Sequence, residues 1–182
     1  MEKKVAILAT NGFEESELES PLNAMKKEGF NVEIVSLEKG SIKSWKDGNW
    51  GKSFDVDKPL KEVSAKDYHA LVLPGGVINP DLLRVEEDAL IFIRDFFKQN
   101  KPVAAICHGA WPLINADVVE GRTMTSYKSI KKDLENAGAL WVDQEVVVDE
   151  ALVTSRNPGD LEAFNAKVIE EIKEGKHDLQ HA

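Results

Sequence analysis

The stretch Lys101-Pro102-Val103-Ala104-Ala105-Ile106-Cys107-His108-Gly109 decides how the chain folds. Its apolar part, 103–106, is short and continuous, which is typical of a strand buried on both faces of a parallel sheet. Cys107 follows directly, where the strand gives way to a helix that we expect over 109–116. Such a strand-to-helix turn is a nucleophile elbow, which raises one side chain above the edge of the sheet. The stretch therefore predicts both an α/β fold and the place of its chemistry.

Apolar runs alternate with helical patterns on both sides of this stretch. We expect strands over 4–9, 31–37, 70–73, 103–106, 146–148 and 152–154, and helices over 16–28, 86–99, 109–116, 127–137 and 160–174. Asp47-Gly48 is a hairpin turn signal, and it predicts a small antiparallel excursion over 41–57. Trp45 and Trp50 flank that turn, where they either pair across strands or mark a subunit interface. The alternation predicts a mostly parallel sheet with helices on both faces, in one domain over 1–182.

The composition narrows the class of protein and of partner. The chain has 182 residues, of which 42% are hydrophobic and 30% charged, with a formal net charge of −9. This acidic balance predicts no nucleic-acid partner, because a phosphate backbone would be repelled. The single cysteine cannot form an internal disulfide, and there is neither an apolar leader nor a run of transmembrane length. We therefore expect a cytoplasmic protein without a membrane partner.

Polar and glycine-rich breaks follow the buried strands, and in a parallel sheet such breaks gather at one edge. The breaks are 11–17, 74–76 and 107–109. Cys107 is either a nucleophile in the resulting cleft or a small buried hydrophobe. As a nucleophile it would gain from the amides and dipole of the following helix, which favour a thiolate. The amides of His108 and Gly109, with one from Gly75 or Gly76, are candidates for an oxyanion hole.

Carboxylates crowd the junction before the first helix: Glu14, Glu15, Glu17 and Glu19. Acids at a helix start complement the helix dipole, and this explains most of them. One carboxyl aimed at the thiol would share a proton with it and so serve as both acid and base. The pattern alone leaves open which of the four points inward.

The remaining candidates are histidines and a tryptophan. His108 acts either as a general base or only through its backbone amide. Trp111, one turn after the elbow, is a candidate for the rim of the cleft. His177 and His181 have a metal-capable spacing near the C-terminus, but a frayed tail explains them better, so we predict no metal site.

Several motifs together carry a family resemblance. Val72-Leu73-Pro74-Gly75-Gly76, the Ile-Cys-His-Gly elbow and Thr154-Ser155-Arg156-Asn157-Pro158-Gly159-Asp160-Leu161 resemble the ThiJ/PfpI superfamily, most closely its PfpI-type peptidase and general-stress-protein branch. The resemblance extends over nearly the whole chain. It implies a flavodoxin-like three-layer sandwich, related to class I glutamine amidotransferase domains, that forms homodimers or dimer-based hexamers and needs no cofactor. The amidotransferase activity itself is not expected, because the later His-x-Glu pair is missing.

The resemblance also implies roles for particular residues. Cys107 matches the nucleophile, Glu17 the glutamate that contacts the thiol, and Glu14 a second acid of the pocket. His108 matches the histidine of a proposed Cys-His-acid triad, whose acid, here Asp81, would come from the neighbouring subunit. Trp111 stands where relatives usually carry glutamine, which we expect to narrow the cleft.

These roles support three candidate functions. The first is detoxification of reactive carbonyls, as a glyoxalase III or a deglycase, acting on a small carbonyl compound or a glycated protein or peptide. It requires only a thiol, one carboxyl and an oxyanion hole. The second is an intracellular cysteine peptidase with a triad shared across subunits. The third is a stress protein without catalysis, an oxidation sensor or a chaperone, whose thiol would be exposed and of low pKa.

Overall fold

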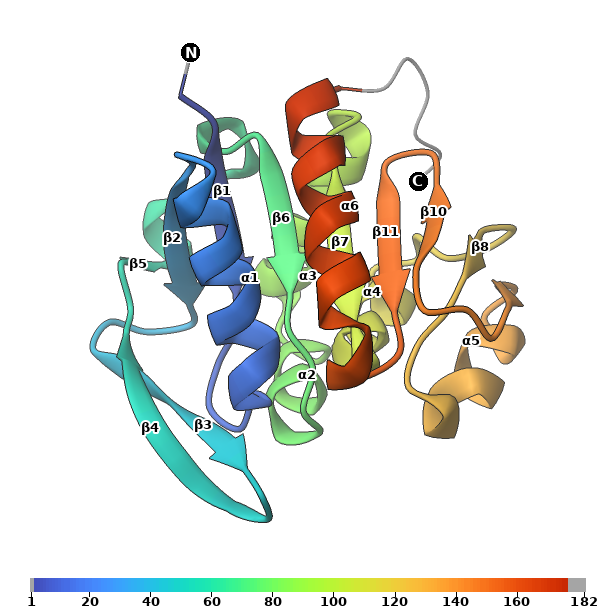
Figure 1. Cartoon of the computed structure of the whole chain (residues 1–182), viewed down its shortest axis with the longest axis horizontal. Helices are drawn as coiled ribbons and strands as arrows, with labels where there is room; N and C mark the ends of the chain where they lie inside the picture. The colour runs from blue at the N-terminus through green and yellow to red at the C-terminus, as the bar shows by residue number, and fades with distance from the viewer. Residues whose placement is uncertain (1, 177–182) are drawn as a thin grey trace.

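A mostly parallel sheet forms the centre of the molecule (Figure 1). The computed structural model describes residues 2–176, and within them this sheet has seven strands in the order β10-β11-β7-β6-β1-β2-β5. The strands are β1 Lys4–Leu8, β2 Asn31–Ser36, β5 Lys58–Pro59, β6 Ala70–Leu73, β7 Val103–Ile106, β10 Val147–Asp149 and β11 Leu152–Ser155. Only β10 runs antiparallel to its neighbour within this sheet. The expected strands, including the pair joined at Asp149-Glu150, are confirmed to within about two residues at either end.

Helices cover both faces of the sheet, which confirms the flavodoxin-like sandwich. Helices α1 (Glu15–Lys27) and α6 (Leu161–Glu174) pack on one face, while α2 (Ile78–Leu83), α3 (Glu87–Lys98), α4 (Trp111–Asn115) and α5 (Lys131–Asn136) belong to the other core. Successive residues of each strand feed opposite cores: Val5 and Ile7 pack toward α1 and α6, whereas Ala6 and Leu8 pack toward α3. This double burial explains why the strands are continuous apolar runs.

The predicted helices differ from the structure where they approach the strand ends. The helix expected over 109–116 begins as a 3-10 turn, Cys107–Ala110, before α4. The helix expected over 127–137 likewise divides into a 3-10 turn, Lys128–Ile130, and α5. Helix α2 is not among the helices that the sequence pattern predicts. Pro80 lies in the first turn of α2, where a missing N–H breaks no helical hydrogen bond.

The predicted hairpin is present as a separate two-stranded sheet of β3 (Ser41–Lys46) and β4 (Asn49–Asp55). Trp45 and Trp50 pair across its strands in an edge-to-face arrangement with ring centroids 5.4 Å apart. The hairpin projects from the sheet beside α1 (Figure 1). It is tied to the loop before α1, because the Trp45 N–H donates to the Phe13 carbonyl at 2.7 Å. A further short parallel pair is formed by β8 (Thr123–Met124) and β9 (Leu140–Trp141).

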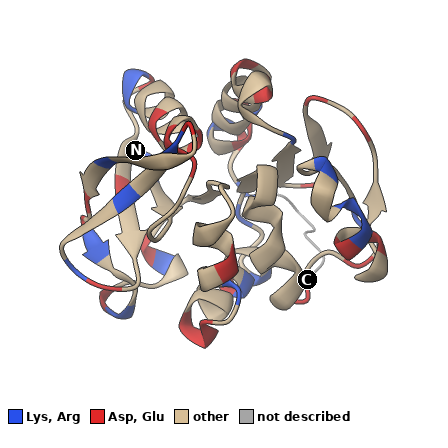
Figure 2. Ribbon diagram, turned by 90° about the horizontal axis from the view of Figure 1, so that it is seen from below, with Lys and Arg blue, Asp and Glu red and all other residues tan. Residues whose placement is uncertain are grey.

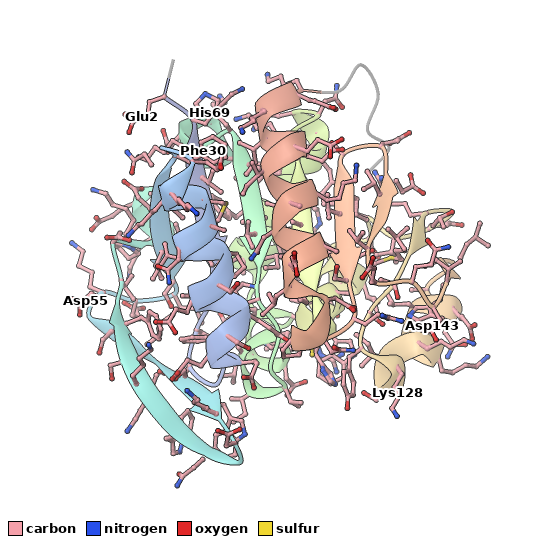
Figure 3. The ribbon with its side chains drawn as sticks, viewed as in Figure 1. Glu2, Phe30, Asp55, His69, Lys128 and Asp143 are labelled. Atoms are coloured by element: carbon pink, nitrogen blue, oxygen red, sulfur yellow. The ribbon has the colours of Figure 1, made fainter. Side chains whose placement is uncertain are left out.

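Lys and Arg residues are interspersed with Asp and Glu residues along the ribbon (Figure 2). Asp55 on the hairpin and Lys128 and Asp143 near α5 are exposed at opposite sides (Figure 3). Within residues 2–176, no helix combines the length and the apolarity that crossing a bilayer requires. His177 and His181, the metal-capable pair of the sequence, lie outside the described residues.

Candidate active site

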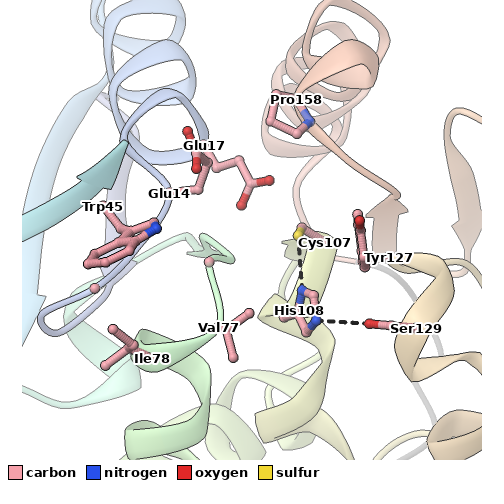
Figure 4. Close-up of a pocket in the computed structure, with 12 residues that line it drawn as sticks. Glu14, Glu17, Trp45, Val77, Ile78, Cys107, His108, Tyr127, Ser129 and Pro158 are labelled. Atoms are coloured by element: carbon pink, nitrogen blue, oxygen red, sulfur yellow. Dashed lines mark hydrogen bonds between the residues drawn. The ribbon is translucent and has the colours of Figure 1, made fainter. Parts of the chain in front are cut away.

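Cys107 occupies a strained turn at the carboxyl end of β7. Its φ is +62°, a left-handed conformation that non-glycine residues rarely adopt, and its side chain is only 7% exposed. Gly109 makes the tight turn possible, since a Cβ there would collide with the Leu73 carbonyl oxygen at the end of β6. This geometry is the predicted elbow, and it directs the sulfur into a cavity (Figure 4).

Glu17 is the carboxyl that points inward. It lies in the first turn of α1 and is fully buried, with Oε2 accepting a hydrogen bond from the Gly75 N–H at 2.8 Å. Oε1 accepts no hydrogen bond from any group that the structure describes. Burial raises the pKa of Glu17 to about 8, although a hydrogen bond with the Cys107 thiol opposes the shift. At neutral pH Glu17 therefore holds a proton beside the sulfur.

The pKa of the Cys107 thiol is raised, first by burial and then by the charge of Glu17. The backbone N–H groups of His108 and Gly76 favour the thiolate but do not outweigh these effects. The prediction that the helix start would favour a thiolate was therefore wrong, because burial and the Glu17 carboxyl outweigh these N–H groups. Two such close groups cannot both be charged cheaply, so the pair holds both protons at neutral pH and releases only one of them as pH rises through about 8. The exposed, low-pKa thiol expected of an oxidation sensor is also not found.

The structure distinguishes among the glycines that were candidates for an oxyanion hole. The Gly75 N–H is engaged by Glu17, whereas the amides of Gly76 and His108 face the sulfur. Gly76 has φ +73°, and a Cβ there would lie 2.6 Å from the Glu14 nitrogen. Gly109 packs behind the elbow instead of facing the cavity. Among the candidate amides, those of Gly76 and His108 are therefore the two that reach the sulfur.

A buried asparagine fixes the loop that carries these glycines. The Asn79 amide donates to the carbonyls of Pro74 and Gly75 at 3.0 and 3.1 Å, and its Oδ1 accepts from the Thr10 N–H at 2.7 Å. Asn79 is fully buried. Local sequence patterns offer no reason to select Asn79, because Thr10 lies in a loop 69 residues away along the chain.

His108 lies beside the thiol, and its ring contacts three further side chains. Its Nδ1 is 3.2 Å from the Cys107 sulfur, and its Nε2 is 3.1 Å from the Ser129 hydroxyl (Figure 4). The imidazole stacks on Tyr127 with centroids 4.9 Å apart and meets the edge of Trp111 at 5.0 Å. Burial lowers the pKa of His108, which keeps the ring neutral. The side chain is therefore close enough to exchange a proton with the thiol.

Trp111 and Asp81 lie away from the cavity wall. The Trp111 indole packs behind His108, donates to Asp133 at 2.9 Å and lies under the Arg84 guanidinium, so it does not form the predicted rim. Asp81 on α2 pairs with Arg84 at 3.2 Å and is more than half exposed. A triad completed by Asp81 of another subunit stays a prediction.

The cavity has a volume of about 580 Å³. Its lining combines the reacting groups with largely apolar walls: Gly12, Glu14, Glu17, Trp45, Gly76, Val77, Ile78, Cys107, His108, Tyr127, Ser129 and Pro158. Glu14 and Trp45 lie across the cavity from Tyr127 and Ser129 (Figure 4). Sequence reasoning did not place Trp45, Tyr127, Ser129 or Pro158 in the site, because segments far apart in the chain bring them there.

The other acids at the start of α1 have different surroundings. Glu15 turns to the hairpin, where it accepts hydrogen bonds from Ser44, Lys46 and Lys52. Glu19 pairs with Lys52 outside the cavity. Glu14 is half-buried against the cavity, and burial raises its pKa. Of the predicted catalytic residues, the structure therefore brings Cys107, Glu17 and His108 together.

The sequence pattern of a known family matches residues 3–171, and its description is the DJ-1/PfpI family. The chain belongs to the DJ-1/PfpI family. This agrees with the ThiJ/PfpI resemblance of the elbow and of the glycine-rich loop.

Curated relatives and a solved structure are similar along nearly their whole lengths. The protein/nucleic acid deglycase 2 of Escherichia coli is 46% identical over 170 residues, covering 93% of this chain and 97% of its own. YraA of Bacillus subtilis, whose name proposes a cysteine protease, is 44% identical, covering 95% of this chain and 100% of its own. The crystal structure of Drosophila melanogaster DJ-1beta superposes with a TM-score of 0.85 at 28% identity, covering 96% of this chain and 95% of its own. These names support an enzyme of the stress-related DJ-1/PfpI type.

Proposed function

We propose that the protein detoxifies reactive carbonyl compounds, as a deglycase or glyoxalase III type enzyme. The observation that carries this proposal is the buried pair of Glu17 and Cys107, which can release only one of its two protons beside the amides of Gly76 and His108. The cavity suits a small neutral carbonyl, because its lining is mainly apolar around the Cys107 thiol. Names of the deglycase relatives agree with this chemistry.

The reaction begins when the pair has released one proton: Glu17 takes the thiol proton as the Cys107 sulfur adds to an aldehyde carbon, and then gives that proton to the carbonyl oxygen. The amides of Gly76 and His108 stabilise the developing oxyanion. Glu17, now a carboxylate, removes hydrogen from that carbon and returns it to the neighbouring carbon, which converts a 2-oxoaldehyde adduct into a thioester. Water hydrolyses the thioester and releases a 2-hydroxy acid and the thiol. With a glycated amine, the same carbon–sulfur bond forms while the carbon–nitrogen bond breaks, and Glu17 protonates the departing amine.

The test is methylglyoxal consumption and lactate formation by the purified protein. Cys107→Ser and Glu17→Gln should each abolish turnover. Glu19→Gln is the matched control, because it removes a carboxyl from the same helix outside the cavity. Full activity of Glu17→Gln would contradict the mechanism, and an inactive wild-type protein would contradict the function.

A cysteine peptidase is the second candidate, favoured by the 3.2 Å approach of His108 Nδ1 to the Cys107 sulfur. In this reaction His108 would take the thiol proton and later give it to the leaving amine. The acid would be Asp81 of a neighbouring subunit in a homodimer or larger assembly. Peptide cleavage that survives His108→Ala would exclude it, whereas cleavage lost together with oligomerisation would support it.

A further inference from the structure

The charges that line the cavity are of one sign. Glu14 and Glu17 are its only acidic residues, and among the residues that the structure describes no lysine or arginine lines it. Glu17 holds a proton at neutral pH, so the charge of Glu14 sets the sign of the potential in the cavity. A phosphate or carboxylate group on a ligand would be repelled there, and a cation would be attracted.

Glu14 differs from Glu15 and Glu19 in its partners. Glu15 pairs with Lys46 and Glu19 pairs with Lys52, whereas no ion pair of Glu14 within residues 2–176 is found. Its carboxyl accepts a long hydrogen bond from the Ser16 hydroxyl, at 3.4 Å, and another from the Ser16 backbone N–H. Burial, followed by smaller contributions that include repulsion from Asp47 and Glu15, raises its pKa. A half-buried carboxylate in this state gains most from a ligand that brings a positive charge.

An aromatic side chain lies beside this carboxylate. The backbone of Trp45 bridges to that of Glu14, and both side chains line the same side of the cavity (Figure 4). The edge-to-face contact with Trp50 fixes the Trp45 ring. A planar cation that meets an indole and a carboxylate together is held by cation–π attraction and by charge-assisted hydrogen bonds.

We propose that Glu14 and Trp45 form a subsite for a guanidinium group, so that the preferred substrates are arginine side chains carrying an early aldehyde adduct. The guanidinium subsite follows from the cavity, whereas the choice of an aldehyde adduct as substrate rests on the proposed function. Arginine keeps its positive charge when an aldehyde adds to one of its nitrogens, so the reacting carbon reaches Cys107 while the cation lies against Glu14. The hemithioacetal of a cysteine side chain is neutral, and an adduct on a nucleotide base carries phosphates, so both gain nothing from this subsite.

The subsite can be tested without turnover, by protection of Cys107 against iodoacetamide. The probes are Nα-acetyl-arginine amide and Nα-acetyl-citrulline amide, which have nearly the same shape and differ in the charge of the side chain. We expect the arginine probe to half-protect the thiol at a concentration about tenfold lower than the citrulline probe. Glu14→Gln should bring the two concentrations within about twofold of each other.

Two further variants sharpen the test. Trp45→Leu keeps the carboxylate and should weaken protection by the arginine probe about threefold while changing the citrulline probe less. Glu19→Gln removes a carboxyl outside the cavity and should preserve the tenfold difference. Equal protection by both probes, no protection by the arginine probe, or a difference that survives Glu14→Gln would overturn the subsite. Failure of methylglyoxal turnover would instead overturn the proposed function, because the protection assay does not depend on it.

Discussion

Glu15 and Glu17 stand two residues apart at the start of α1, and both are buried, yet their carboxyls have opposite properties. Glu15 receives hydrogen bonds from the Ser44 hydroxyl at 2.7 Å, the Lys46 ammonium and the Lys52 amide, and its pKa falls to about 2. Glu17 receives one backbone hydrogen bond, faces a thiol, and its pKa rises to about 8. Burial dominates the pKa of Glu17, whereas hydrogen bonds dominate that of Glu15, and this difference separates a group that is ready to transfer a proton from one that anchors the hairpin.

The two carboxyls also act on stability in opposite directions. The folded state holds the Glu17 proton more tightly than the unfolded chain, so its contribution is present below pH 4.5 and is lost as pH rises through about 8. The folded state favours ionised Glu15, so that contribution is present above pH 4.5 and is lost as pH falls toward about 2. At neutral pH, the buried Glu17 carboxyl therefore lowers the free energy of unfolding.

Of the substitutions that distinguish Glu17 from Glu15, Glu17→Gln should have the largest effect, and that effect is on turnover. We expect methylglyoxal turnover to fall by about a thousandfold, because glutamine cannot move a proton between neighbouring carbons. Cys107 should still be alkylated by iodoacetamide, since the elbow and the amides of Gly76 and His108 remain. Turnover within tenfold of the wild type would show that the buried pair is not the proton shuttle.

The same variant should be more stable than the wild type, increasingly so as pH rises. Removing the carboxyl removes a penalty that grows to about 4 kcal/mol between pH 4.5 and pH 8, the range over which the pKa of Glu17 is raised. Urea unfolding of both proteins at pH 5 and pH 8 measures this difference. A stability difference that does not change with pH would mean that Glu17 is ionised in the folded protein.

Glu15→Gln should lower the free energy of unfolding, whereas Glu17→Gln raises it, and the change should be smaller. We expect a loss of about 2 kcal/mol at pH 7, because Ser44, Lys46 and Lys52 lose a charged acceptor. The loss should shrink as pH falls below 4.5, where the unfolded chain begins to bind the proton. Urea unfolding at pH 7 and pH 3.5 provides the comparison, with Glu19→Gln as the exposed control. An equal loss of stability at both pH values would contradict the conclusion that the folded protein stabilises the ionised form of Glu15.

The sequence predicts those features of the structure that depend on a local pattern of residues. The runs 70–73 and 103–106 were recognisable as strands because burial on both faces requires continuous apolar residues. Helix α2 was missed because its residues include Pro80 and follow a glycine-rich loop. The choice of Glu17 over Glu15 came from the family resemblance, because residues two apart on a helix point in different directions and the pattern does not fix the phase.

The parts of the site contributed by distant segments left no local signal. Trp45 reaches the cavity because Glu15 anchors the hairpin, and Ser129 reaches His108 because a 3-10 turn follows Tyr127. Each of these contacts joins side chains more than twenty residues apart in the chain. Spacing rules describe neighbours on one helix or strand, so they predict the elbow but not the walls around it.

Ser129→Ala should have the smallest effect on turnover. The variant decides whether His108 is a structural anchor, as Glu15 is, or transfers protons, as we propose for Glu17. The Nε2 nitrogen would lose its hydroxyl partner, while the stack on Tyr127 and the edge contact with Trp111 still hold the ring. If His108 is only held in place, methylglyoxal turnover should change by about threefold or less, and its pH profile should not move. If His108 exchanges protons with Cys107, the profile should shift and Ser129→Thr, which retains the hydroxyl, should restore it. A shift in peptide cleavage without a shift in methylglyoxal turnover would assign His108 to the peptidase reaction, because only that reaction requires its side chain.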